Sequence, residues 1–252
     1  MNMITRLLLG GDVMLGRLVK KAILAYGIDY PMGNIVSLMS QADLTIVNLE
    51  CAITTNPQRW SGTQKSFYFG APPEASQILS RCGINLVNLA NNHILDYDVN
   101  GLLDTLNYLK QEHISYVGAG KNAEEAYRPA YIQVKNQKFG MVAFCDHQPD
   151  FAAQPHRAGM AYLDLREEKN CITQLEYGLE QLQKAKVDWP ILSLHWGPNM
   201  VHRPSEKFIR IAHAAIDMGY KLLFGHSAHV FQGVEIYRDA PIIYAAGDLV
   251  DD

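Results

Sequence analysis

Polar side chains follow five apolar runs of the sequence, each at the point where the run ends. The clearest case is KLLFGHSAHV, where three apolar residues lead into Gly225, His226 and His229. The other four runs end in side chains that can also bind metals, namely Asp12, Glu50, the triplet Asn91, Asn92 and His93, and His195. Such runs are typical of buried strands, and α/β proteins build sites at the carboxyl edge of a sheet. We therefore expect five strands to converge on one polar centre.

These residue types are suited to a metal centre. Mixed carboxylate, amide and imidazole sets favour divalent ions such as Mn²⁺, Fe²⁺, Zn²⁺ or Mg²⁺. A bridging carboxylate permits two ions about 3.5 to 4 Å apart, a spacing that clamps the attacking and leaving oxygens of a displacement. The predicted ligands are Asp12, Glu50, Asn92, His195, His226 and His229.

Taken singly, each predicted ligand has a simpler interpretation. Asp12 could cap a helix, Glu50 could form a salt bridge, and Asn92 could occupy a left-handed turn position. His226 and His229 could be ordinary hydrogen-bonded histidines. It is the recurrence of such residues after five separate strand-like runs that favours one shared site.

The hydrophobic pattern alternates between strands and helices. Expected strands cover residues 4–9, 44–49, 84–89, 130–134, 139–144, 191–194, 222–224, 233–237 and 241–244. Expected helices cover residues 15–26, 38–43, 73–82, 101–112, 165–186 and 205–218. This alternation predicts parallel strands joined by right-handed crossovers, with hairpins at 130–144 and 233–244.

Three local features carry further expectations. Gly10 to Asp12 are expected to form a turn after the first strand. The polar, proline-containing segment 54–73 is expected to pass over the site instead of entering the core. Asp96 and Asp98 are expected to cap the helix that begins near Val99.

Composition restricts the class of protein. With 252 residues, 48% of them hydrophobic and 19% charged, the chain suits one α/β domain over residues 1–252. The net charge of −4 and the lack of a basic block argue against a nucleic-acid partner. The four separated cysteines are expected to be buried and reduced. The oligomeric state is left open.

Neither a signal peptide nor an apolar stretch of membrane-spanning length is visible in the sequence. We therefore expect a soluble, cytoplasmic protein. The sequence stops at GDLVDD, directly after a strand-like run and without a closing helix. That ending indicates a chain truncated at its C-terminus.

Six motifs occur in a characteristic order along the chain: GGDVMLGR, NLE, LANNHILDY, HWG, GHSAHVFQGVE and IIYAAGDLV. In this order they resemble the signature of the bacterial capsule-synthesis family (poly-γ-glutamate, CapA-like), within the calcineurin-like metallophosphatase superfamily. The resemblance extends from Asp12 to Asp248. It implies a four-layer α/β/β/α sandwich of two mixed sheets flanked by helices, with a dimetal site on strand-end loops.

The resemblance also implies a role for each polar residue. It assigns Asp12 and His229 to a first metal, Asn92, His195 and His226 to a second, and Glu50 to both. His93 is the implied catalytic residue beside the site, as proton donor or as a contact to the transition state. Arg17 and Asn91, in the same motifs, are the predicted substrate-binding residues.

The chain departs from the superfamily pattern at several positions. The first motif is usually Asp-x-His, but Met14 stands here, so the first metal has one imidazole fewer. The bridging carboxylate is Glu50 instead of an aspartate. Ser227 and Ala228 replace the two middle residues of GHHPHV, Pro198 and Asn199 follow HWG where an acidic residue is frequent, and GDL replaces GNF.

Two classes of function are compatible with these residues. The first is a metal-dependent hydrolase or phosphoesterase, in which metal-activated water attacks an anionic ester or related bond of a small molecule or polymer and His93 protonates the leaving group. The second is a non-catalytic binding or scaffold protein for an anionic polymer, which Met14 favours. A nuclease is disfavoured by the net charge.

Overall fold

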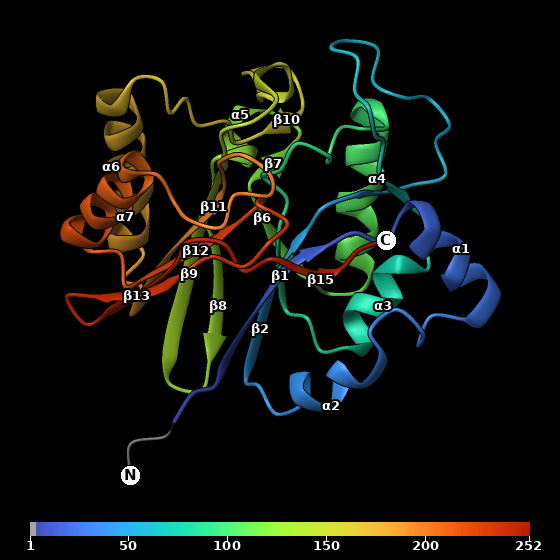
Figure 1. Cartoon of the computed structure of the whole chain (residues 1–252), viewed down its shortest axis with the longest axis horizontal. Coiled ribbons are helices and arrows are strands. Elements are labelled where there is room, and N and C mark those ends of the chain that lie inside the picture. Colours follow the sequence, from blue (N-terminus) through green and yellow to red (C-terminus); the bar gives the residue numbers. More distant parts are fainter. Residues whose placement is uncertain (1–3) are drawn as a thin grey trace.

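Two β-sheets pack face to face and helices cover their outer faces in the computed structural model, which describes residues 4–252 (Figure 1). The helices α1, α3 and α4 lie outside one sheet, and α6 and α7 lie outside the other. The predicted four-layer α/β/β/α arrangement is confirmed. Among the described residues, no helix combines the length and apolar character needed to cross a bilayer.

Five of the seven helices in residues 4–252 begin and end within about three residues of the predicted positions, whereas α2 begins and ends earlier than the predicted 38–43 and α5 was not predicted. Their bounds are α1 Arg17–Tyr26, α2 Val36–Met39, α3 Ala75–Arg81, α4 Asp98–Gln111, α5 Ala123–Ala126, α6 Glu168–Lys184 and α7 Glu206–Met218, with 3₁₀ turns η1 Gly33–Ile35 and η2 Pro149–Phe151. The α7 helix shows which residues made the helix ends predictable. Ser205 Oγ accepts a hydrogen bond from the Phe208 backbone N–H, and Gly219 ends the helix with a φ of 126°.

The first sheet has five strands and all of its pairings are parallel. Its order is β15 (Asp248–Val250), β1 (Leu7–Val13), β2 (Leu44–Leu49), β5 (Leu86–Asn88) and β6 (Ser115–Val117). The prediction of two mixed sheets is therefore wrong for this one. The reason is that helices connect β1, β2, β5 and β6, and a helical crossover returns the chain in the same direction.

The second sheet is mixed, with antiparallel strands at both edges. Its order is β13 (Val234–Tyr237), β14 (Ala240–Ile243), β12 (Leu222–His226), β11 (Trp189–His195), β9 (Gln137–Cys145) and β8 (Ala130–Val134). Both predicted hairpins, β8–β9 and β13–β14, form the edges. Two further sheets have two short strands each. One pairs β3 (Ala52–Ile53) with β4 (Gly70–Ala71), and the other pairs β7 (Ala119–Gly120) with β10 (Gly159–Met160).

Strand β9 shows how one continuous run of apolar residues packs against the layers on both of its faces. Met141 and Ala143 pack toward the first sheet, whereas Val142 and Phe144 pack toward α6 and α7. Successive side chains of a strand point to opposite faces, so a continuous apolar run marks a strand buried on both sides. Full burial of a side chain such as Met141, Val142 or Phe144 contributes about 1.5 to 3 kcal/mol.

Strand β1 runs further than predicted and contains Asp12 within it. The expected turn at Gly10 to Asp12 is wrong, because the strand continues through both glycines to Val13 with a register irregularity between Leu9 and Asp12. At this point β1 and β15 approach closely, and the Asp12 N–H donates to Gly247 O at 2.9 Å. A Cβ at Gly11 would lie only 1.6 Å from Gly247 O.

Gly11→Ala is therefore expected to destabilise the fold by about 3 kcal/mol, because the methyl group meets backbone atoms that cannot rotate away. Urea unfolding would measure the change. Gly233→Ala is the matched control, since a Cβ there has open space. It should change the free energy of unfolding by less than about 1 kcal/mol. Equal effects of the two substitutions would contradict the packing argument.

Candidate metal centre

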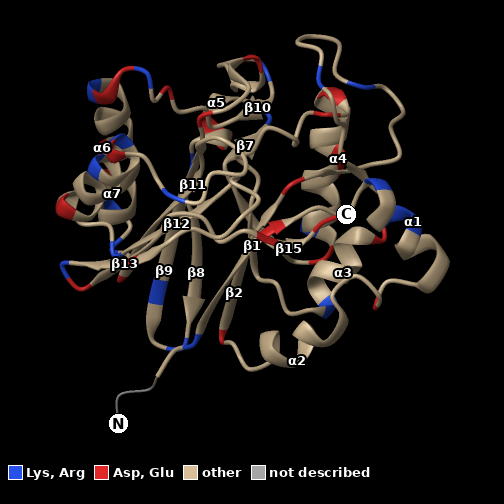
Figure 2. Cartoon of the chain, viewed as in Figure 1, with Lys and Arg blue, Asp and Glu red and all other residues tan. Residues whose placement is uncertain are grey.

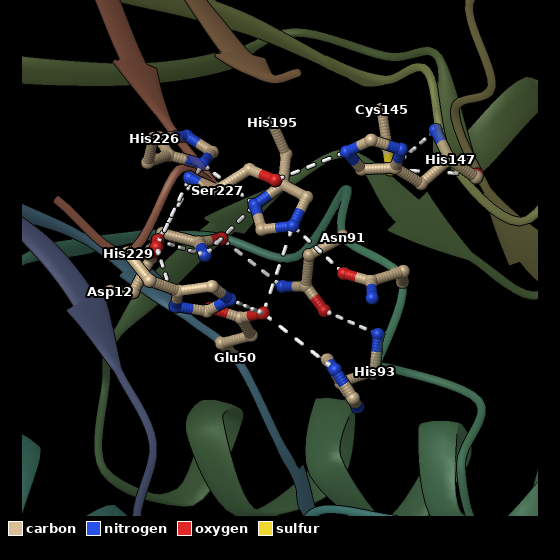
Figure 3. A network of polar contacts seen from close by, with 12 residues as sticks. Asp12, Glu50, Asn91, His93, Cys145, His147, His195, His226, Ser227 and His229 are labelled. Atoms are coloured by element: carbon tan, nitrogen blue, oxygen red, sulfur yellow. Dashed lines mark hydrogen bonds and ion pairs between the residues drawn. The ribbon is translucent and has the colours of Figure 1, made fainter. Parts of the chain in front are cut away.

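The predicted ligands converge at the carboxyl ends of strands from both sheets (Figure 3). Figure 2 shows acidic residues gathered at the neighbouring ends of β1 and β15. Asp12 lies on β1, Glu50 follows β2, Asn92 follows β5, His195 ends β11, His226 ends β12, and His229 lies in the loop after β12. The geometric expectation that five strand ends meet is confirmed.

Glu50 lies at the centre of the group. Its Oε1 is 3.8 Å from His93 Nε2, 3.7 Å from His195 Nε2 and 4.0 Å from His229 Nε2. The residue is 1% exposed, and neither carboxylate oxygen has a hydrogen-bond partner among residues 4–252. Burial, and then the nearby Asp12, raise the pKa of Glu50 well above its usual range.

This arrangement fits a metal ion. An isolated buried carboxylate is costly unless it is paired or coordinates a metal. Separations of 3.7 to 4.0 Å between Glu50 Oε1 and the imidazole nitrogens of His195 and His229 are close to twice a metal–ligand distance of about 2.0 to 2.2 Å. A divalent cation would supply the partner that the protein does not.

Asp12 is the second buried carboxylate of the centre. Asn48 Nδ2 donates to its Oδ1 at 2.7 Å, and the Ser227 N–H donates to its Oδ2 at 3.1 Å. His226 Nδ1 lies 3.8 Å from Oδ1. Burial raises the pKa of Asp12 to about 7, against the hydrogen bond from Asn48. Asp12 is thus fixed in orientation; its alternative role as a helix cap does not occur, because Gly16 precedes α1.

His195 and His226 form a buried imidazole pair. Their Nδ1 atoms are 2.9 Å apart, and His195 Nε2 is 2.8 Å from Asn92 Oδ1. Ser193 Oγ lies 2.9 Å from His226 Nε2. Burial lowers the pKa of His226 to about 3 and that of His195 well below its usual value, so both rings are neutral. Neutral imidazole is the form that binds metals.

His93 lies beside the centre and is held by residues that the sequence did not indicate. Its Nδ1 is 2.6 Å from Asp96 Oδ2, and Asp96 Oδ1 pairs with Lys65 Nζ at 2.5 Å. Phe69 stacks on the ring with centroids 3.8 Å apart. The prediction that Asp96 caps α4 is wrong, because its carboxylate is buried and occupied by His93, Lys65 and the Phe69 N–H. The expected cap Asp98 is the first helical residue, and its Oδ1 accepts from the Val99 N–H.

Lys65 lies on the loop between β3 and β4, where the expectation that segment 54–73 passes over the site is confirmed. The expectation is wrong for Phe69 and Ala71, which are buried in the core at β4. Besides Asp96, the Lys65 ammonium group contacts the backbone carbonyl of Asn92 and lies 3.4 Å from His93 Nδ1. Its side chain is only 8% exposed. A polar loop without periodicity gives no sequence signal for such a contact.

Three asparagines tie the strand ends together under the site. Asn88 and Asn91 both donate to Asn48 Oδ1, at 2.6 and 3.1 Å, and Asn48 in turn donates to Asp12. Asn91 also donates to Leu49 O at 2.8 Å, and its Oδ1 accepts from the His93 N–H. The Asn91 side chain is fully buried and holds the loop that carries His93, so it is not exposed to a substrate.

Arg17 lies at the start of α1, at the edge of the site. Its guanidinium pairs with Asp252 at 3.2 Å and stacks over Phe67 at 4.8 Å and Phe69 at 5.8 Å. Because Phe69 also stacks on His93, one aromatic ring separates Arg17 from the predicted proton donor. A contact between Arg17 and a substrate stays a prediction.

Asp248, the first residue of β15, also lies at the site, although it was not among the residues predicted from the sequence. Its Oδ1 lies 3.0 Å from His229 Nδ1, and this hydrogen bond raises the pKa of His229 against the effect of burial. Two sets of side chains each offer ligand atoms within 4.8 Å of one another: Asp12 with His195 and His226, and Asp12 with His229 and Asp248. The signal was present in the sequence, because Asp248 follows IIYAAG in the same format as the other strand ends.

Comparison with known proteins shows the family of this chain. Residues 6–252 match the family model described as bacterial capsule synthesis protein PGA_cap. The chain belongs to this family. The resemblance seen in the sequence motifs is therefore confirmed over nearly the whole chain.

Curated relatives carry capsule and polyglutamate names. This family member is 28% identical to the capsule biosynthesis protein CapA of Bacillus anthracis, covering 96% of this chain and 58% of that protein. It is 26% identical to the PGA biosynthesis protein CapA of Bacillus subtilis, covering 96% of this chain and 62% of the relative. The chain thus spans about three-fifths of the length of these two relatives.

Solved structures confirm the fold. A hypothetical protein from Thermus thermophilus aligns with a TM-score of 0.54 at 15% identity, covering 97% of this chain and 77% of that chain. A Staphylococcus aureus structure named provisionally as a 5′-nucleotidase aligns with a TM-score of 0.56 at 14% identity, covering 98% of this chain and 49% of that chain. The PGA_cap chain has the calcineurin-like metallophosphatase fold.

Proposed function

We propose that this PGA_cap protein is a metal-dependent hydrolase of the phosphoesterase type, which cleaves an anionic ester or a related bond. The observation that carries the proposal is the Glu50 carboxylate, buried without a hydrogen-bond partner among the described residues and surrounded by imidazoles. Buried polar groups without partners are rare, and those with strongly shifted pKa values cluster at functional sites. The cofactors proposed are two divalent ions, chosen from Mn²⁺, Fe²⁺, Zn²⁺ and Mg²⁺.

The proposed ligands are assigned to two ions that share Glu50. They are Asp12 and His229 for the first ion, Asn92, His195 and His226 for the second, and Glu50 for both. Asp12 also lies close to the second set, because it offers a ligand atom within 4.8 Å of those of His195 and His226. When bound, such ions lower the pKa of a water molecule and stabilise negative charge on the reacting oxygens. The hydrogen bonds from Asn48 and Ser227 keep the Asp12 carboxylate aimed at the centre.

His93 is the proposed proton donor to the leaving group. Its Nδ1 is bound to Asp96, whose other oxygen is bound to Lys65, so Nε2 is the atom that faces the centre. A side chain held in this way can protonate a leaving oxygen without reorienting. Stacking on Phe69 fixes the plane of the ring.

The substrate class follows from the relatives' names. The Bacillus relatives are named for capsule and PGA biosynthesis, and the motifs of this chain resemble those of the poly-γ-glutamate family, whose polymer carries a carboxylate on each residue. We therefore propose an anionic polymer, or a small anionic molecule related to it, as the substrate.

Hydrolysis of 4-nitrophenyl phosphate and bis(4-nitrophenyl) phosphate with Mn²⁺ tests the proposal. Asn92→Ala and His195→Ala should each lower the rate by at least about 100-fold, because even residues that only support metal ligands are worth 10- to 100-fold. His202→Ala, at an exposed histidine, should retain wild-type activity. Equal activity in all four proteins would contradict the assignment. Metal uptake without hydrolysis of any ester would favour the non-catalytic binding protein.

A further inference from the structure

His229 and Asp248 face each other on the open side of the metal centre. His229 Nδ1 and Asp248 Oδ1 are 3.0 Å apart, and each side chain is 23% exposed. The two carboxylates beside them are almost fully buried, with Asp12 and Glu50 both 1% exposed. The pair therefore stands where the centre meets solvent, and water would compete for the histidine if the carboxylate did not hold it.

The position of Asp248 is fixed by the sheet. Asp248 is the Cα partner of Asp12 in the β1–β15 pairing. On either side of it, the Asp12 N–H donates to Gly247 O and the Met14 N–H donates to Val250 O, both at 2.9 Å. The Asp248 carboxylate therefore projects from a strand that is hydrogen-bonded to β1 on both sides of it.

The hydrogen bond determines which nitrogen of His229 is available to a metal. A neutral imidazole carries one N–H, and an ionised carboxylate can only accept a hydrogen bond. With Nδ1–H donated to Asp248, the lone pair of His229 lies on Nε2. That atom is 4.0 Å from Glu50 Oε1, a separation that accommodates one ion between the two atoms.

The first metal has few other ligands to hold it. Met14 Sδ accepts a hydrogen bond from the Gly16 N–H at 3.0 Å, so this side chain is directed to the backbone. Among the described residues, Asp12, Glu50 and His229 are then the proposed ligands of the first ion. With only three ligands, the orientation of the single imidazole has a large influence on affinity.

We propose that Asp248 is a positioning residue for the first metal, which fixes the proton of His229 on Nδ1 and so aims Nε2 at the ion shared with Glu50. This inference rests on the proposed metal centre. The competing role for Asp248 is direct coordination, because its carboxylate also lies within 4.8 Å of ligand atoms of Asp12 and His229. A positioning residue needs only a hydrogen-bond acceptor, whereas a carboxylate ligand also needs its charge.

Calorimetric titration of the full chain with Zn²⁺ separates the two roles. Asp248→Ala should weaken one of two zinc sites by 10- to 100-fold and leave the other unchanged. Asp248→Asn should stay within about threefold of wild type, since the amide oxygen accepts the same hydrogen bond. Asp251→Asn is the matched control, because it removes a nearby charge that contributes to the field at His229 without a hydrogen bond to the ring. It should bind zinc as wild type does.

A second measurement reports the contact itself. In zinc-loaded protein, long-range proton–nitrogen NMR should show His229 protonated at Nδ1 and metal-bound at Nε2. An unchanged affinity in Asp248→Ala, an equal loss in Asp248→Asn, or metal on Nδ1 would each overturn the inference. Wild-type protein that takes up no zinc would overturn both the proposed function and the inference. Zinc binding as described, without ester hydrolysis, would overturn the proposed function alone.

Discussion

Glu50→Gln is expected to remove metal-dependent activity and metal-dependent stabilisation together. The carboxylate is the proposed ligand of both ions, and the amide that replaces it carries no charge to offset theirs. Breaking a buried charge pair costs about 3 to 5 kcal/mol, which corresponds to roughly a thousand-fold loss of activity. Ester hydrolysis with Mn²⁺ would measure this loss. Activity within tenfold of wild type would contradict a bridging role for Glu50.

Without metal, Glu50→Gln should change how the stability of the fold depends on pH. Burial and Asp12 raise the pKa of Glu50 in the folded protein, so the folded state holds a proton that the unfolded chain releases near its usual value. The stability of the wild type is therefore full below the unfolded-state pKa of about 4.3 and falls as the pH rises from there through the folded-state pKa. Metal-free Glu50→Gln should match wild type near pH 4 and be more stable at pH 9. Thermal unfolding in EDTA would show this, and a variant less stable at both pH values would contradict it.

His93→Gln is expected to slow hydrolysis according to the leaving group. Proton donation by a positioned side chain is worth about 10² to 10⁴-fold, but only when the leaving oxygen needs the proton. The loss should therefore be about 10² to 10⁴-fold for an alkyl phosphate and less than about tenfold for a 4-nitrophenyl ester. Rates for a series of esters with different leaving groups would measure the dependence.

Metal content provides the internal control for His93→Gln. Nε2 of His93 lies 3.8 Å from Glu50 Oε1, and the proposed role of His93 is proton donation instead of metal binding, so the variant should retain its metal. His202→Gln, at an exposed histidine, should match wild type with every ester. An equal loss with all leaving groups, or loss of metal from His93→Gln, would assign His93 to metal binding instead.

Much of the fold was predictable because the apolar runs are continuous. Runs such as residues 44–49 and 191–194 form β2 and β11, because short continuous apolar runs are typical of strands buried on both faces. The errors came from backbone geometry. Gly10 and Gly11 suggest a turn by composition, yet β1 passes through them because β15 approaches too closely for a side chain at Gly11.

The supporting residues of the site were harder to predict than its centre. Asn48 sits inside an apolar run, where nothing in the sequence shows that its amide would reach Asp12. Lys65 and Asp96 are 31 residues apart in irregular segments, so their ion pair depends on the path of the loop between β3 and β4. Side-chain partners of this kind are set by three-dimensional proximity and leave no period to detect.

The sequence by itself determined that polar, metal-competent side chains would stand at the ends of five strands, because hydrophobic runs end where the chain leaves the core. It also determined the family, through the order of the motifs. Only the tertiary structure decided which ends meet. The pairing of β15 beside β1 brings Asp248 next to His229 and Asp12, although β1 and β15 come from opposite ends of the chain. Strand order depends on the packing of all layers at once, so no local pattern encodes it.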